Sequence, residues 1–93
     1  MEREKRIYPR SKVRWPVTMT TSVGTIEGET IDVSSLGAYI QCREPLNASE
    51  NFVLSVRLPV GSPLRVFAEV VWSNSTGLES GNGPPGMGVR FLW

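Results

Sequence analysis

Short runs in which apolar and polar residues alternate are the feature that most constrains the fold of this chain. In residues 52–58, which read FVLSVRL, every second residue is a large apolar one. A period of two residues is typical of a β-strand with one buried face. Similar runs predict strands over residues 13–20, 25–33, 38–42, 64–73 and 87–93. No stretch shows a sustained helical period, so the chain is predicted to be all-β.

Six short strands separated by turns favour an antiparallel barrel or a sandwich. We prefer the barrel because closure removes the exposed edges of a sheet. The length of 93 residues suits one small domain. We therefore expect a small six-stranded antiparallel β-barrel over residues 13–93. Pro16 should lie at the start or the edge of its strand, since proline cannot donate a hydrogen bond to a ladder.

The run over residues 25–33 breaks the alternation. Ile26 and Ile31 are an odd number of positions apart, so they cannot share one face of a regular strand. Gly28, which lies between them, is the expected position of a β-bulge that resets the parity and re-aims Asp32. In the later run over residues 64–73 the alternation is unbroken and predicts that Leu64 and Trp72 face inward with the aliphatic residues between them.

Charge divides the chain into a basic arm and an acidic body. Residues 1–14 carry six basic and two acidic residues, a net charge of +4, whereas the whole chain carries +1 and the remainder therefore −3. Residues 1–12 are polar, and Pro9 prevents a helix. We interpret them as an N-terminal arm that is mobile without a partner. A basic arm on an acidic body indicates an anionic partner held by the arm.

The residue types that are missing exclude most enzyme classes. The chain has no histidine and one cysteine, Cys42, so no catalytic triad, Cys/His metal cluster or internal disulfide is expected. Cys42 alternates with apolar residues and is predicted to be a core residue. There is no apolar run long enough to span a membrane and no signal peptide. We expect a cytoplasmic protein that is not an enzyme and uses no cofactor or metal.

One short stretch, Asp32–Gly37, concentrates polar groups between two predicted strands. Asp32 is the only aspartate in the chain, and Ser34 adds a hydroxyl that can donate or accept. Gly37 permits either a positive φ or the close approach of another group. Taken alone, these residues are more typical of a local Asx-type turn than of a ligand site.

A second motif precedes this stretch. Arg6 and Arg10 are separated by three residues on the arm, and together the two motifs resemble the RxxxR and [D/N]xSxxG signatures of the PilZ family. The resemblance continues through Val70-Val71-Trp72 and the closing stretch 86–91, GMGVRF, and covers essentially the whole chain. Arg10 and Arg14 have the same spacing, but Pro9-Arg10 looks more like the end of the family's arm.

The resemblance implies a split-barrel fold that binds the bacterial second messenger cyclic di-GMP. Arg6 and Arg10 would grip the ligand, and Asp32, Ser34 and Gly37 would form the floor of the site. A basic residue at the position of Lys5 tends in the family to accompany two stacked ligand molecules. Many members also carry a C-terminal helix, whereas this sequence stops at Trp93, which is then exposed or stacked on another copy in a homodimer.

The chemistry of these residues fits such a ligand. The planar fork of an arginine matches the O6/N7 edge of guanine and can also pair bidentately with phosphate. The carboxylate of Asp32 can accept from guanine N1–H and N2–H or hold an arginine in place. Trp72 offers either an aromatic face at the rim of the site or a core side chain, and both interpretations stay open.

The resemblance implies a switch in which the ligand orders the arm across the barrel and so creates a surface for a protein partner. Two alternatives compete with this interpretation. The first is a PilZ-like interaction module that binds no nucleotide. The second is a small barrel that binds single-stranded nucleic acid through the arm, which the acidic body disfavours.

Overall fold

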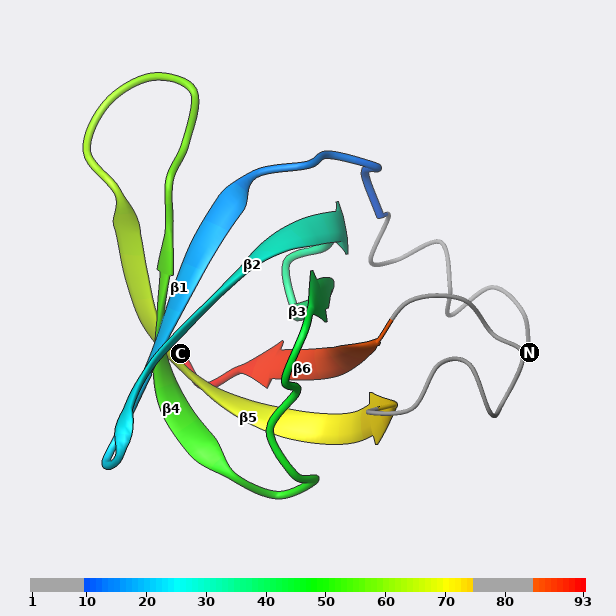
Figure 1. Cartoon of the computed structure of the whole chain (residues 1–93). Helices are drawn as coiled ribbons and strands as arrows, with labels where there is room; N and C mark the ends of the chain where they lie inside the picture. The colour runs from blue at the N-terminus through cyan, green and yellow to red at the C-terminus, as the bar shows by residue number, and fades with distance from the viewer. Residues whose placement is uncertain (1–9, 75–84) are drawn as a thin grey trace.

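The structure is a computed structural model that describes residues 10–74 and 85–93. Its elements are six strands: β1 (Pro16–Thr21), β2 (Gly24–Val33), β3 (Gly37–Cys42), β4 (Asn51–Val56), β5 (Leu64–Asn74) and β6 (Gly86–Phe91). They close into an antiparallel barrel in the order β1-β2-β3-β6-β5-β4, with β4 returning to β1 (Figure 1). The described residues contain no helix. The predicted six-stranded barrel is therefore confirmed.

The barrel interior is filled by the apolar residues of the alternating runs. Met19, Ile40, Leu54 and Met87 come from four different strands, and each is fully buried. Cys42 lies in the same core, as its alternation predicts. Burial of these side chains is the main stabilising contribution in a domain of this size, at about 1.5–3 kcal/mol for each large aliphatic residue.

The first strand begins later than the sequence suggests. Residues 13–15 are outside β1, which starts at Pro16. Thr30 connects this segment to β2: its buried hydroxyl accepts from the backbone N–H of Trp15 at 2.8 Å and donates to the carbonyl of Val13 at 2.5 Å. Its backbone N–H also donates to the carbonyl of Trp15 at 2.9 Å. A β-strand that begins at a proline fits the missing N–H of that residue, as expected.

A bulge in β2 does occur, but the prediction that places it at Gly28 is wrong. Gly28 is in regular register on both sides, opposite Val17 of β1 and Cys42 of β3. The register shifts instead between Thr30 and Asp32, which makes Ile31 the extra residue. Thr30 faces the core, and the bulge turns Asp32 to the outside.

A second register shift, in β5, corrects the expected orientation of Trp72. The shift falls between Val70 and Trp72, so Val71 is the extra residue. Val70 is buried, whereas Trp72 is 47% exposed and lies on the outer surface of the barrel. Leu64, at the other end of β5, is also exposed rather than inward-facing.

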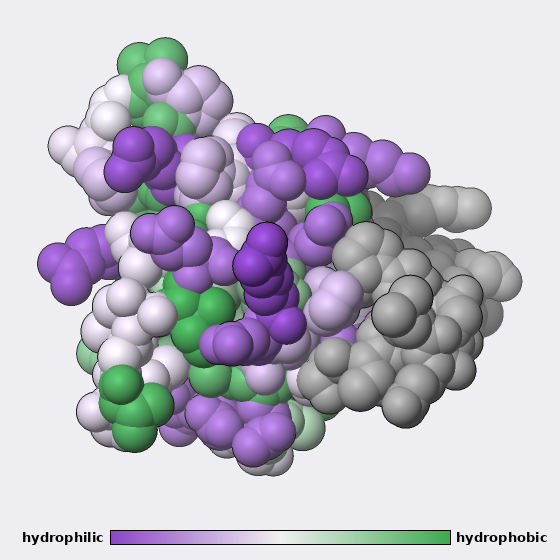
Figure 2. Space-filling model, in the orientation of Figure 1, coloured by the Kyte–Doolittle hydropathy of each residue, from purple (hydrophilic) through white to green (hydrophobic). Residues whose placement is uncertain are grey.

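The barrel surface is largely polar on the face seen in Figure 2, where hydrophobic residues form small, separate areas. The loop between β4 and β5 projects away from the barrel (Figure 1) and carries the exposed Val60. Within residues 10–74 and 85–93 there is no helix that could cross a membrane.

Candidate functional site

Four residues form a row across the outer surface of the barrel. Asp32 on β2 is opposite Tyr39 on β3, Tyr39 is opposite Gly88 on β6, and Gly88 is opposite Trp72 on β5. The two ends of the row are Asp32 and Trp72, and each directly follows a register shift in its own strand. The bulges at Ile31 and Val71 are therefore what turns Asp32 and Trp72 to the same outer face.

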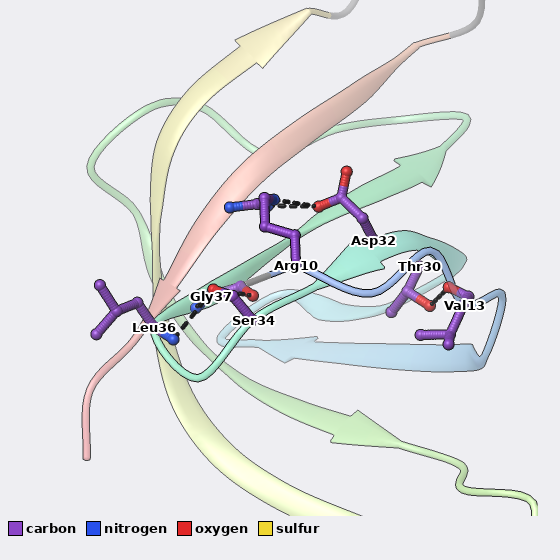
Figure 3. A network of polar contacts seen from close by, with 7 residues as sticks. All are labelled: Arg10, Val13, Thr30, Asp32, Ser34, Leu36 and Gly37. Carbon is purple, nitrogen blue, oxygen red and sulfur yellow. Dashed lines mark hydrogen bonds and ion pairs between the residues drawn. The ribbon is translucent and has the colours of Figure 1, made fainter. Parts of the chain in front are cut away.

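Arg10 joins the row at its acidic end. Its guanidinium binds the carboxylate of Asp32, with Nε 2.8 Å from Oδ1 and Nη2 bonded to the same oxygen (Figure 3). The backbone next to Arg10 is held in place, because the N–H and carbonyl of Ser11 both hydrogen-bond to Val33 at the end of β2. The structure thus brings together one residue from each of the two sequence signatures, 22 positions apart.

This ion pair leaves polar groups available. Among the described residues, neither Asp32 Oδ2 nor Arg10 Nη1 has a hydrogen-bond partner, so each can still meet a ligand. The Arg10 side chain is 52% exposed, and that of Asp32 is 24% exposed. An exposed pair of this kind contributes about 0–1 kcal/mol, so a ligand can rearrange it at little cost.

Ser34 and Gly37 occupy structural positions in the turn between β2 and β3. The Ser34 hydroxyl is buried and accepts from the N–H groups of Leu36 and Gly37 at 3.2 and 3.3 Å (Figure 3). Gly37 does not have a positive φ; a Cβ there would collide with the carbonyl oxygen of Val89 on β6. Glycine is needed at this position because two backbones approach closely, and Ser34 holds the turn that presents Asp32.

The C-terminal segment packs against the same turn. The indole N–H of Trp93 donates to the carbonyl of Ser35 at 3.0 Å, and the Trp93 ring packs edge-on against Phe91 at 5.2 Å between centroids. Trp93 nevertheless remains 73% exposed. These contacts link the last residue to the turn of the signature, which no sequence pattern indicates.

Two residues that sequence reasoning did not place at the site lie beside it. Tyr39 stands in the middle of the row, and alternation around it predicts only that it faces outward. Arg90 on β6 is opposite Gly37 and forms an ion pair with Glu69 at 2.7 Å. Strand alternation predicts their outward orientation, but only the pairing of β3 with β6 brings them next to the signature.

The remaining basic and cysteine residues considered from the sequence are not seen at the row. Lys5 and Arg6 lie outside the described residues. Arg14, the alternative partner of Arg10 in an RxxxR pair, instead binds Glu29 at 3.0 Å. Within the part of the chain that the structure describes, no group of acidic, cysteine or histidine residues could hold a metal ion. Burial raises the pKa of the Cys42 thiol from 9.0 to about 11, as befits a core residue.

The chain is a small closed six-stranded β-barrel domain that carries an arginine, a carboxylate and an aromatic ring on one outer face. The PilZ domain family model matches residues 4–93, nearly the whole chain. The chain therefore belongs to the PilZ family, which confirms the resemblance seen in its motifs. No curated protein sequence matches it.

Solved structures share the fold at low sequence identity. The PilZ domain of YcgR from Escherichia coli, determined with c-di-GMP, superposes with a TM-score of 0.73 at 15% identity, over 91% of this chain and 76% of that one. A structure of YcgR in complex with c-di-GMP gives 0.74 at 17% identity, over 91% of this chain and 37% of that one. The Bacillus subtilis inhibitor of motility MotI/DgrA superposes with a TM-score of 0.74 at 16% identity, over 92% of this chain and 41% of that one. The chain thus spans well under half of these last two proteins.

Proposed function

We propose that this chain is a receptor domain for cyclic di-GMP. The observation that carries the proposal is the contact between Arg10 and Asp32, which joins the arginine signature to the acidic signature at one place on the barrel. Membership of the PilZ family supports it, as do the c-di-GMP complexes of structurally similar domains.

The proposed contacts follow from the chemistry of each side chain. Arg6 and Arg10 bind guanine edges and phosphates, since a guanidinium can do both. Asp32 accepts from guanine through Oδ2, and Trp72 offers an aromatic face. With Lys5 next to Arg6, the site holds two cyclic di-GMP molecules stacked on each other. Ser34 and Gly37 act by shaping the floor of the site beneath these groups.

The proposed output is a change of surface. A ligand held by both arginines fixes the arm across the barrel, next to the row from Asp32 to Trp72. The combined surface of arm, ligand and barrel is then available to a downstream protein partner in the bacterial cytoplasm. We propose no catalytic step, and neither a membrane nor a nucleic acid as partner. A homodimer remains a separate hypothesis.

Isothermal titration of the wild-type protein with cyclic di-GMP tests the proposal. We expect saturable binding, with a stoichiometry near two if Lys5 acts as proposed. Cyclic di-AMP is the matched control ligand, because it keeps both phosphates and the ring but lacks the guanine O6, N1–H and N2–H groups. Absence of heat with cyclic di-GMP at tens of micromolar would instead support an interaction module without nucleotide. Strong, salt-dependent binding of oligonucleotides would support the nucleic-acid alternative.

A further inference from the structure

Tyr39 and Trp72 form a stacked aromatic pair on the outer surface of the barrel. Their ring centroids are 5.3 Å apart, and the ring planes differ by 28°. The two residues come from β3 and β5, which are not neighbours, because β6 lies between them. The rings therefore meet across β6, above the position of Gly88.

Two glycines of β6 make this arrangement possible. A Cβ at Gly88 would lie 2.8 Å from Cε2 of the Trp72 indole, and a Cβ at Gly86 would lie 2.8 Å from the hydroxyl oxygen of Tyr39. Real Cβ atoms do not approach other atoms this closely. The rings thus lie directly on the β6 backbone, on a floor without side chains that Gly86 and Gly88 provide.

This floor and the Tyr39 ring restrict the orientation of the indole. Trp72 is bounded below by Gly88 and on one side by Tyr39, yet it remains 47% exposed. Tyr39 itself is directly opposite Asp32, so it lies between the Arg10–Asp32 ion pair and the indole. A planar group held by the ion pair would extend over Tyr39 toward Trp72.

We propose that Tyr39 is a positioning residue that holds the Trp72 indole as a stacking face for a guanine of the bound nucleotide. The inference rests on the proposed function. It adds a residue outside both signatures and assigns the glycines of the 86–91 stretch to a role in the site. Tyr39 acts through its ring, and its hydroxyl is not required.

Titration with cyclic di-GMP of the wild type, Tyr39→Phe and Tyr39→Ala tests this role. Tyr39→Phe keeps the ring and should bind within about twofold of the wild type. Tyr39→Ala frees the indole and should weaken binding roughly threefold to tenfold, the range expected when one aromatic pair is lost. Phe67→Ala is the matched control, because Phe67 is an exposed aromatic residue of β5 away from the row, and its binding should equal that of the wild type.

Fluorine NMR of protein labelled with 5-fluorotryptophan supplies a readout that a general loss of stability would not imitate. The chain has three tryptophans, and Trp72→Phe identifies the resonance of Trp72. We expect that resonance to move on addition of cyclic di-GMP and to shift in ligand-free Tyr39→Ala but not in Phe67→Ala. If Tyr39→Ala does not fold, Tyr39→Leu replaces it, since leucine fills the space without a ring.

The outcomes separate this inference from the proposed function. Normal binding by Tyr39→Ala, with an unmoved Trp72 resonance, overturns the role of Tyr39 alone while the wild type still binds. A wild type that does not bind cyclic di-GMP overturns the proposed function and this inference together. Weakened binding by Tyr39→Ala with an altered Trp72 resonance, beside normal Tyr39→Phe, supports the inference.

Discussion

The two sides of the barrel differ in how regularly their strands pair. Around β1 and β4, the pairings β1–β2, β1–β4 and β4–β5 run without a register shift. On the other side, β2–β3 and β5–β6 each contain one shift, at Ile31 and at Val71. The regular side buries alternate residues such as Val17, Met19 and Leu54 in the core, whereas the shifted side turns Asp32 and Trp72 outward.

This difference shows how a small barrel can combine a stable core with an outer face to which we propose that a ligand binds. A strict alternation would bury Asp32 beside Thr30 and Trp72 beside Val70, at the cost of an unpaired buried carboxylate and an overfilled core. One extra residue in each strand moves both side chains outward and leaves the core of aliphatic residues intact. We expect the regular side to determine stability and the shifted side to determine ligand affinity.

The largest effect that this comparison predicts is on the regular side. Leu54→Ala removes a fully buried side chain of β4 and should lower the free energy of unfolding by about 2–5 kcal/mol. Urea unfolding followed by circular dichroism measures the change. At urea concentrations well below the unfolding midpoint, the dissociation constant of the folded variant for cyclic di-GMP should be within about twofold of the wild-type value. A large loss of affinity there would mean that the two sides are not separable.

The arginines of the arm provide the converse test. Arg6→Ala and Arg10→Ala should each weaken cyclic di-GMP binding at least tenfold, a loss of about 1.4 kcal/mol, since each removes a charged, bidentate group. Stability should change little, because the Arg10 side chain is 52% exposed and an ion pair of this kind contributes about 0–1 kcal/mol.

Arg14→Ala is the matched control for these variants. Arg14 forms an ion pair with Glu29 rather than with Asp32, and its loss should leave affinity unchanged. Calorimetric titration of all three variants decides the assignment. If both Arg6→Ala and Arg10→Ala bind like the wild type, the site is assigned wrongly.

Asp32→Ala should have a smaller effect on binding than the arginine variants. It removes one acceptor for guanine and releases Arg10, but leaves the positive charge that attracts the phosphates. We expect an affinity loss of roughly threefold to tenfold, with thermal unfolding close to that of the wild type, as is usual for an exposed ion pair. A variant that does not fold would show that Asp32 is needed for the β2 bulge itself.

The smallest predicted effect concerns the core and appears only at high pH. The folded state holds the pKa of Cys42 at about 11, above its ordinary value of 9.0, because burial disfavours the thiolate. The folded state therefore retains a proton that the unfolded state loses. This contribution to stability is complete below about pH 9 and falls as the pH rises toward 11.

Urea unfolding between pH 7 and 10.5 measures this dependence, with Cys42→Ala as the comparison. The variant should be less stable at neutral pH because of the space it leaves, but its stability should fall less steeply above pH 9. Parallel curves for the two proteins would contradict the buried position of the thiol.

The comparison also explains which features could be predicted. On the regular side, residues 52–58 predict β4 and its buried face, because each strand keeps a period of two. The odd spacing of Ile26 and Ile31 leads to the expectation of a bulge at Gly28, but the register there is regular, and Ile31 is the extra residue instead of a second core residue beside Ile26. Glycine permits a bulge, but the pairing of β2 with both β1 and β3 determines where the extra residue falls. In β5 no break in the pattern indicates a shift at all, because Val71 and Trp72 are both apolar.

The sequence by itself determined the approximate positions of the strands, the inward face of most of them, the all-β class and the two signatures that identify the PilZ family. These features are local, since they depend on residue types at short and fixed spacings. Only the tertiary structure decided that Arg10 binds Asp32, that Tyr39 and Trp72 stack across β6, and that Ser34 serves the turn. Such contacts depend on the register between strands distant in the chain, and register is set by all the pairings of the closed barrel together.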